Sequence, residues 1–322
     1  MRLNRLLVLV AGMTLLGAPR FASAQNPECA PLVLHPQARN VCNAAVDGTR
    51  TFHPLAGGLV SGGNPVIGRG GTLGGFGHAA FTVRANAGEI SVPSLEFDGT
   101  GTTVEQEDEI AFPAPLVEAA VGVWGGLPGG LLAIDALGSA VLLPDEIDDL
   151  RVDPDAASIG SVALGLGYGA RIGILPGRGF VPAVSLSVMR RSVPRVQYGD
   201  TGAGDDYSYS VDLAATNLRL VAGSSFGPLA VAAGIGRDWY TGDAIVRFRD
   251  PATVAVIGEA ALELDESRTM LFADAGLSLG LVALVGELGW QSGTGADLET
   301  TFEGFDPEDG MVFGGLGLQV GF

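Results

Sequence analysis

The sequence predicts an all-β fold, a transmembrane antiparallel β-barrel, from three observations. Apolar residues alternate with small or polar residues along many segments, and short and long connections alternate between those segments. Mean hydropathy is positive, at +0.34, yet beyond the N-terminal leader no stretch offers the roughly 18 uninterrupted apolar residues of a transmembrane helix. A barrel wall produces this combination, because only every second side chain of each strand faces lipid.

The chain begins with the pattern of a secretory signal peptide. Arg2 and Arg5 form the positive region, Leu6 to Leu16 form the apolar region, and Ala22-Ser23-Ala24 form the cleavage site. We expect residues 1–24 to be removed from the mature chain. A secreted, soluble β-protein would carry the same signal, so the pattern of the strands and connections has to separate the two readings.

The segment at 25–54 does not alternate and contains four prolines. We expect an irregular segment that either enters the barrel lumen as a plug or hangs in the periplasm. Cys29 and Cys42 are the only cysteines, and in an exported protein we expect a disulfide between them, worth about 3 kcal/mol in the chain-entropy model. Their spacing lacks the companion ligands of a metal site, so we expect no metal.

The barrel is expected to occupy residues 55–322. Its clearest strand runs from Ser161 to Ile172, where even-numbered residues are apolar and odd-numbered residues are small or polar. A helix would mix these two sets, because its side chains repeat every 3.6 residues or so rather than every two. We therefore expect the even-numbered face to meet lipid and the odd-numbered face to line the lumen.

The same reading gives a barrel of about 14 strands. The number must be even if both termini are periplasmic, and 12 is the alternative if the pair flanking Asp250-Pro251 is dropped. The expected strands cover residues 55–61, 77–86, 89–97, 111–124, 130–142, 158–174, 180–197, 207–222, 228–240, 243–250, 252–262, 268–280, 282–292 and 311–322.

Two kinds of connection alternate along the chain. Short ones are rich in turn formers, as in Asn86-Ala87-Gly88 and Gly125 to Gly130, whereas the others are mostly longer and acidic. The acidic ones, with Asp243 in one further tight connection, hold 24 of the 36 carboxylates. Short periplasmic turns and longer external loops are typical of outer-membrane barrels.

The last twelve residues, Met311 to Phe322, carry the family resemblance. Leu316, Leu318, Val320 and the terminal Phe322 form one apolar set, and the residues between them are small or polar. Together with the signal peptide, this stretch resembles bacterial outer-membrane β-barrel proteins. The resemblance implies a bacterial outer-membrane location, contact with outer-membrane lipid, and a terminal aromatic that closes the last strand and is recognised by the barrel-assembly machinery.

Several ionisable residues are expected on or near the lumen-facing side of the strands. Such side chains mostly satisfy one another's charge in a barrel interior, and contact with a solute is the alternative role. The register at Arg219 and Arg237 is ambiguous. The lumen-facing candidates are His78, Arg84, Glu118, Arg171, Arg219, Arg237, Asp274 and Glu287.

Charge and composition exclude several functions. The net charge of −18 argues against nucleic acid, because phosphate neutralisation needs clustered cations. The glycine-rich run at 62–75 lacks a Walker lysine and a following helix, so it is no phosphate loop; we expect a flexible loop or backbone packed closely against the wall. The three histidines form no nucleophile constellation with a serine, so we expect neither an enzyme nor a cofactor.

Two functions fit these expectations. The first is passive transport of a small molecule, and the 14-strand architecture with an N-terminal lumen segment resembles the FadL-type transporters, which implies a hydrophobic solute such as a long-chain fatty acid or an aromatic hydrocarbon. The second is a closed barrel with a structural or surface-interaction role. A lumen filled by arginine–carboxylate pairs and the N-terminal segment would favour the second.

Overall fold

The computed structural model describes residues 26–32, 34–111, 114–144, 146–147, 150–178, 181–251 and 256–321. The expected signal peptide at 1–24 and the expected barrel-closing residue Phe322 lie outside the described residues. Among the described residues, no helix is both long enough and apolar enough to cross a membrane.

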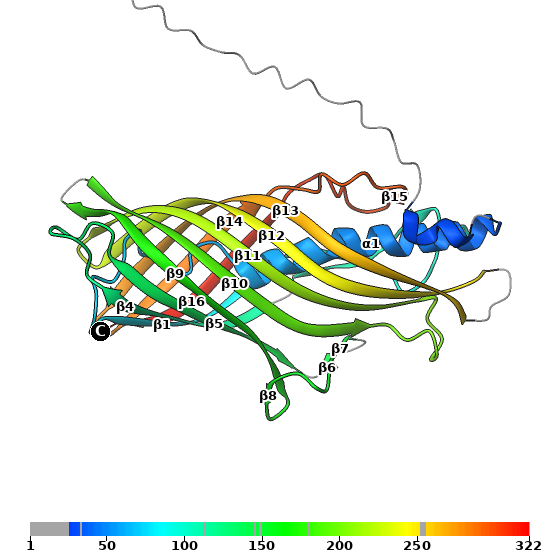
Figure 1. Cartoon of the computed structure of the whole chain (residues 1–322), viewed down its shortest axis with the longest axis horizontal. Coiled ribbons are helices and arrows are strands. Elements are labelled where there is room, and N and C mark those ends of the chain that lie inside the picture. Colours follow the sequence, from blue (N-terminus) through cyan, green and yellow to red (C-terminus); the bar gives the residue numbers. More distant parts are fainter. Residues whose placement is uncertain are drawn as a thin grey trace, which may run out of the picture.

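Ten antiparallel strands close into a barrel (Figure 1). Each strand of the ring, including β9 and β10, pairs with the ring strands that precede and follow it in the chain. β1 pairs with β16 and so closes the ring. The strands of the ring are β1 (Ala79–Pro93), β4 (Ala114–Trp124), β5 (Ile134–Pro144), β9 (Val162–Arg178), β10 (Val181–Tyr198), β11 (Tyr207–Phe226), β12 (Leu229–Arg249), β13 (Val256–Leu279), β14 (Val282–Gln291) and β16 (Met311–Gly321).

Six short strands of the described chain lie at one end of this barrel. β3 pairs with β1, β7 with β10, β6 with β7 and β8 with β9, whereas β2 and β15 form a separate parallel pair. They are β2 (Thr103–Val104), β3 (Gln106–Ala111), β6 (Glu146–Ile147), β7 (Leu150–Val152), β8 (Ser158–Ile159) and β15 (Thr301–Phe302). We call this the loop end, and the opposite end, where tight connections join the strands, the turn end.

The expected numbers of 14 and 12 strands are wrong. Three pairs of expected strands are single strands, because 77–86 joins 89–97 in β1, 228–240 joins 243–250 in β12, and 252–262 joins 268–280 in β13. Polar residues such as Asp243 and Glu263 suggested connections, but both lie on strands that continue beyond the apolar part of the wall.

The expectation of an irregular segment at 25–54 is also wrong, as is that of a strand at 55–61. A short 3-10 helix, η1 (Pro27–Leu32), precedes a helix of 26 residues, α1 (Pro36–Ser61). Pro36 occupies the first turn, where its missing N–H costs nothing and its fixed φ suits a helix. Buried Ala38, Val41 and Ala45 recur at helical spacing, and this packing inside the barrel outweighs the internal Pro54.

Helix α1 enters the lumen from the loop end and runs toward the turn end (Figure 1). It packs against β1, β11, β12 and β13. The chain then continues through the remaining lumen without regular structure and reaches the first residue of β1 at the turn end. We call residues 62–73 of this continuation the threaded segment. It and α1 are mostly buried.

An apolar band surrounds the outside of the turn-end half of the barrel. Tyr168, Arg190, Thr216 and Trp239 face outward in one register row across β9 to β12. Between Trp239 and Leu229, strand β12 has about the 9–11 residues that a tilted strand needs to cross a hydrocarbon core. Exposed Trp and Tyr side chains at this row resemble the aromatic girdle of membrane barrels.

Beyond this row the polarity of the wall is reversed. β11, β12 and β13 project toward the loop end, and their outward side chains there include Asp243, Glu259 and Glu263. Their inward side chains are apolar, as Val246, Phe248 and Leu262 are buried in one cluster with both cysteines. The projecting half therefore has the inside of a soluble protein, built on strands that continue from the membrane band.

Candidate functional site

The lumen of the membrane band contains a network of buried ion pairs. Arg84 on β1 lies 3.0 Å from a carboxylate oxygen of Glu118 on β4 and 3.2 Å from one of Glu287 on β14. Arg191 on β10 also reaches Glu118, at 3.0 Å, although β5 and β9 separate these two strands in the ring. These side chains are nearly or completely buried. The network therefore joins strands across the barrel interior rather than only along the wall.

A second group of polar side chains holds the end of α1. Arg219 pairs with Asp238 and also donates to the carbonyl oxygens of Gly62 and Gly63, at 2.8 and 3.0 Å. Asn217 donates to the hydroxyl of Ser61 at 3.0 Å. The last carbonyls of a helix have no partners within the helix and carry partial negative charge. A buried guanidinium at this position satisfies carbonyls just past that end.

Wall carboxylates accept hydrogen bonds from backbone amides of the threaded segment. Glu287 accepts from the N–H groups of Gly63 and Asn64, at 2.8 and 2.6 Å. Asp274 accepts from the Asn64 side chain at 3.1 Å and from the N–H of Gly68. These interactions replace the water that exposed backbone amides would otherwise bind.

The same arrangement continues toward the turn end. Asp135 accepts from the N–H of Leu73 at 3.1 Å while it pairs with Arg171 at 2.7 Å. Wall side chains also donate to carbonyls, as Asn86 does to Leu59 at 2.8 Å and Ser185 to Gly70 at 2.7 Å. The wall therefore fixes the end of α1 and the threaded segment through both donors and acceptors.

Glycines allow the threaded segment to lie against the wall. A Cβ atom on Gly63 would lie 2.5 Å from the ring of Phe272, and one on Gly70 would lie 2.1 Å from the backbone nitrogen of Gly223. Neither position has room for a side chain. Of the two expectations for the glycine-rich run, close packing describes these positions.

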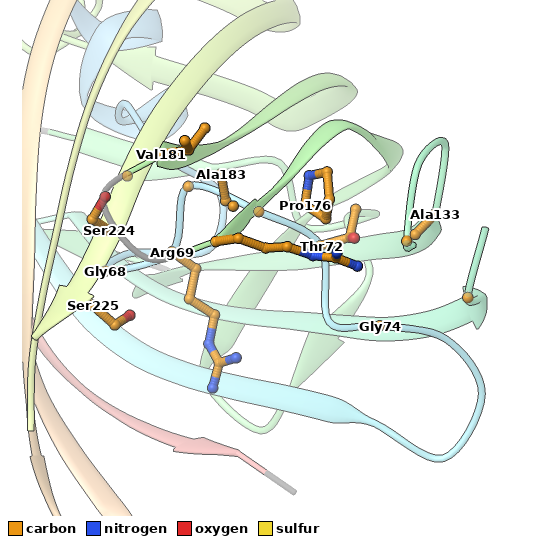
Figure 2. Close-up of a pocket in the computed structure, with 17 residues that line it drawn as sticks. Gly68, Arg69, Thr72, Gly74, Ala133, Pro176, Val181, Ala183, Ser224 and Ser225 are labelled. Carbon is orange, nitrogen blue, oxygen red and sulfur yellow. The ribbon is translucent and has the colours of Figure 1, made fainter. Parts of the chain in front are cut away.

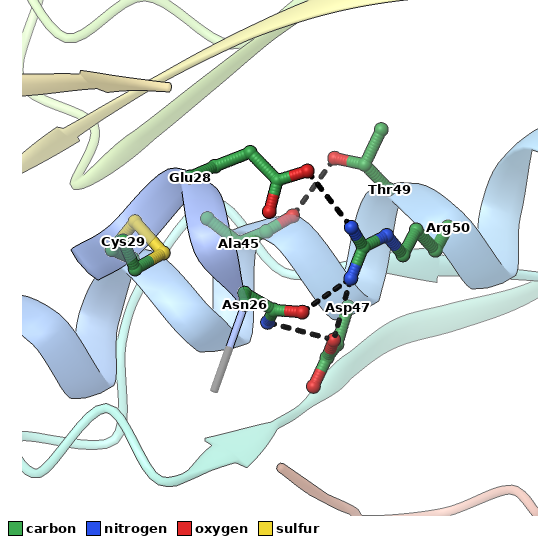
Figure 3. Close-up of a disulfide and its surroundings, with 8 residues drawn as sticks. Asn26, Glu28, Cys29, Ala45, Asp47, Thr49 and Arg50 are labelled. Carbon is green, nitrogen blue, oxygen red and sulfur yellow. Dashed lines mark hydrogen bonds and ion pairs between the residues drawn. A yellow bond between two sulfur atoms is a disulfide. The ribbon is translucent and has the colours of Figure 1, made fainter. Parts of the chain in front are cut away.

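At the loop end, the predicted disulfide between Cys29 and Cys42 is confirmed (Figure 3). The Cα atoms are 5.8 Å apart, and the bond ties η1 to α1. Beside it, Asn26 donates to Asp47 at 3.0 Å and Arg50 donates to Glu28 at 2.9 Å. The start of α1 is therefore held by one covalent bond and several polar contacts.

Asp47 connects α1 to the long connection between β14 and β16 at the loop end. Its carboxylate accepts from the backbone N–H groups of Glu299 and Thr300, at 2.7 and 2.9 Å, and from the Thr300 hydroxyl at 2.9 Å. Asp47 has no exposed surface. The loop between β14 and β16 is thereby docked on the helix that enters the lumen.

The structure places the sequence candidates at different depths. Arg84, Glu118, Arg171, Arg219, Asp274 and Glu287 are buried in the lumen. Arg237 faces outward, because its neighbours Gly236 and Asp238 face inward, and it donates to the outward hydroxyls of Thr269 and Ser267. A register error of one residue transfers a side chain to the opposite face, so the expectation that Arg237 lines the lumen is wrong.

His78 is likewise not in the lumen. It is exposed at the turn end, immediately before β1, and its Nδ1 lies 3.2 Å from the carbonyl oxygen of Gly75. His53 lies on α1 and His35 just before it. The three histidines are thus in three separate places. No group of three or more His, Cys, Asp or Glu side chains within the described part of the chain is arranged to hold a metal ion.

Sequence reasoning missed several members of the site. Asp135, Arg191, Asn217 and Asp238 alternate in phase with buried neighbours on their strands, and that periodicity could have identified them. Asp47 has no comparable signal, because its partners Glu299 and Thr300 lie 252 and 253 residues away in the chain.

No protein-family model matches the sequence, and no curated protein matches it. Among solved structures, the outer-membrane protease OmpT from Escherichia coli is similar at 10% identity, with a TM-score of 0.41 over 76% of this chain and 96% of that chain. The translocator domain of the autotransporter NalP from Neisseria meningitidis is similar at 14% identity, with a TM-score of 0.37 over 86% and 96%.

The Pseudomonas putida toluene transporter TodX is similar at 12% identity, with a TM-score of 0.28 over 85% of this chain and 96% of that chain. Similarity at this level carries no information on activity, and the proteins concerned include both transporters and a protease. The fold assignment rests on the chain's own geometry, in which antiparallel strands close into a ring and an apolar band surrounds the outside. These are the features of a transmembrane β-barrel.

Proposed function

We propose that this protein is a closed outer-membrane barrel that presents the start of its N-terminal helix, together with the acidic loop end, at the cell surface for interaction with other molecules. The turn end faces the periplasm, since short periplasmic turns and longer external loops are the rule in such barrels. Lipid contacts the apolar band, and the barrel-assembly machinery inserts the chain. These assignments extend the expectations drawn from the sequence.

One observation carries this proposal. The threaded segment is bonded to wall side chains on both its amide and its carbonyl sides, from Gly62 to Leu73. Emptying the lumen would leave Glu287, Asp274 and Arg219 without these partners in a buried site, which is costly for charged groups. A closed lumen is therefore the stable arrangement of this wall.

Passive transport of a small molecule is the alternative function. It would require the threaded segment to leave the lumen or to shift within it. A hydrophobic solute fits poorly, because the lumen of the membrane band is lined by Arg84, Glu118, Arg191, Glu287 and Asp274. Transport of a polar solute would need the same displacement.

Conductance in planar bilayers tests the closed state. We expect the intact protein to give no steady conductance, and a variant lacking residues 36–73 to give open channels if it still shows the heat-modifiable gel mobility of a folded barrel. Because that deletion could prevent folding, Arg219→Ala provides a second test and should give transient openings. Steady, solute-dependent conductance of the intact protein would overturn the closed-barrel proposal.

Surface labelling tests the orientation. An epitope inserted after residue 26 should bind antibody on intact cells, whereas the same epitope in the tight turn at 227–228 should bind only after the outer membrane is permeabilised. The opposite pattern would place the loop end in the periplasm and contradict the proposed surface role.

A further inference from the structure

An open cavity of about 390 Å³ lies at the turn end of the lumen (Figure 2). The threaded segment forms one side of it, and the connections between β4 and β5, β9 and β10, and β11 and β12 form the remainder. Its polar lining includes Arg69, Thr72, Arg178, Ser224 and Ser225. None of the residues that line it is a carboxylate.

The two arginines of this cavity differ from most of the others in the described chain. Eight described arginines form ion pairs with carboxylates. Arg69 and Arg178 are exposed, and within the described residues neither guanidinium has a hydrogen bond or an ion pair. Two wall carboxylates bond backbone amides of the threaded segment nearby, Asp274 at Gly68 and Asp135 at Leu73, and Asp135 also pairs with Arg171. In a chain of net charge −18, this end combines two free cations with no carboxylate in the lining.

Arg69 also lines a neighbouring cavity of about 220 Å³, again without a carboxylate in its lining. Figure 2 shows its side chain extending beside Ser225, away from Thr72. The guanidinium is 3.2 Å from the position that a Cβ on Gly321 would take. The free charge therefore lies between the two hollows and can approach a ligand in either.

The remaining lining suits an anion. Ser224 and Ser225 carry hydroxyl donors. Gly74 has open space where a side chain would stand, so that a ligand can approach the backbone closely at this position. A guanidinium presents several N–H donors in a planar fork that matches the oxygens of a phosphate.

We propose that this cavity binds a phosphate group through Arg69, Arg178 and the Ser224–Ser225 turn. The phosphate can belong to the headgroup of an anionic phospholipid at the periplasmic face or to a free phosphate compound, and both present the same oxygens to the two guanidinium groups. The site is independent of the surface role of the loop end, which lies at the other end of the barrel.

Calorimetry on the full chain in neutral detergent tests this proposal, with inorganic phosphate as the probe. Arg69→Gln and Arg178→Gln should each weaken phosphate binding by about tenfold or more, since each removes a charge-assisted hydrogen bond. Arg39→Gln is the matched control. It removes the same charge from an arginine that also lacks a side-chain partner within the described residues but lies on the first turn of α1 at the loop end, and it should leave binding unchanged.

Native mass spectrometry from nanodiscs distinguishes the two sources of phosphate. Retention of phosphatidylglycerol by the intact protein, lost in Arg69→Gln and Arg178→Gln but kept in Arg39→Gln, would identify a lipid headgroup. Phosphate binding without lipid retention would identify a free phosphate compound. Equal weakening by all three variants, or no phosphate binding by the folded intact protein, would overturn the site. Both cavity arginines are exposed, so heat-modifiable mobility should confirm that these variants fold.

Discussion

The two halves of this barrel use the same strands with opposite polarity. In the membrane band of β12, Ile235 faces outward and Asp238 faces the lumen, whereas in the projecting half Arg247 faces outward and Phe248 faces inward. Alternation with a period of two continues through both halves, and only the solvent on each side changes. Strand geometry fixes only which side chains share a face, and the medium that contacts each face determines whether those side chains are apolar or polar.

This difference sets how each half holds α1 and the segment that follows it. The membrane half uses buried charge and hydrogen bonds to the backbone, so removing one partner leaves others buried and unpaired. The projecting half uses apolar contact around the disulfide. The stability lost on a substitution there should therefore scale with the buried volume that is removed. The same substitution should therefore have different costs in the two halves.

The largest effect is expected from Arg219→Ala in the membrane half. It leaves the fully buried Asp238 and the carbonyls of Gly62 and Gly63 without their guanidinium partner, and breaking such a pair costs about 3–5 kcal/mol. The control is Arg247→Ala in the projecting half, because Arg247 and its partner Glu259 are both about half exposed and surface pairs contribute under about 1 kcal/mol. Urea unfolding from lipid vesicles measures both, and equal losses would contradict the comparison.

Phe248→Ala should have the largest effect in the projecting half. The ring is 1% exposed and packs in the apolar cluster that surrounds Cys29 and Cys42, and removing a buried phenylalanine costs about 3–5 kcal/mol. Ile245→Ala changes a partly exposed residue on the opposite face of the same strand and should cost clearly less. Protease digestion at the start of α1 measures the effect. Similar sensitivity in the two variants would show that this half lacks an apolar interior.

The comparison also explains which parts of the fold were predictable from the sequence. Which face of a strand points outward could be predicted from the local sequence. The expectation that Leu166 and Tyr168 face outward is confirmed, since they are 55% and 73% exposed. Strand number was not readable, because Asp243 and Glu263 are polar for the same reason that loop residues are polar: both face water. The reversal of polarity made one long strand look like two short ones.

The contents of the lumen were less predictable. Arg191 and Glu118 lie on strands that are not neighbours, so only closure of the barrel brings them together. Asn64 and Gly68 were part of a glycine-rich run without periodicity, and their positions depend on wall carboxylates far away in the chain. Alternation identifies which side chains face inward but not which of them meet there.

Loss of the disulfide should have the next largest effect, and it should be confined to the projecting half. The variant Cys29→Ser with Cys42→Ser frees η1 from α1, and closing a loop of this length contributes about 3 kcal/mol in the chain-entropy model. Amide hydrogen exchange should rise in η1 and the first turns of α1 while the amides of Gly63 and Asn64 stay protected. Equal exchange at both places would show that the helix and the threaded segment are released as one unit.

The smallest effect is expected from acid, acting through His53 on α1 above the membrane band. Burial lowers its pKa to about 4, and its Nε2 lies 3.2 Å from the backbone carbonyl oxygen of Asp212, to which it donates. The seated helix therefore keeps the imidazole neutral, whereas a released helix would bind a proton below about pH 6.5. The packing of α1 in the barrel should therefore weaken as pH falls from about 6.5 to 4. The loss is at most about 3 kcal/mol, at about 1.4 kcal/mol per unit of pKa.

Protease digestion of α1 across this pH range measures the loss, and His53→Gln, which keeps a side-chain N–H donor but cannot titrate here, should flatten the profile. Arg195 pairs with the Asp212 carboxylate at 2.8 Å, and His53→Gln leaves that ion pair in place. A profile that is unchanged in His53→Gln would assign the acid response to carboxylates elsewhere. Because His53 lies where the apolar and the charged interiors meet, a flattened profile would show that protonation of this single imidazole weakens the packing of the helix at that boundary.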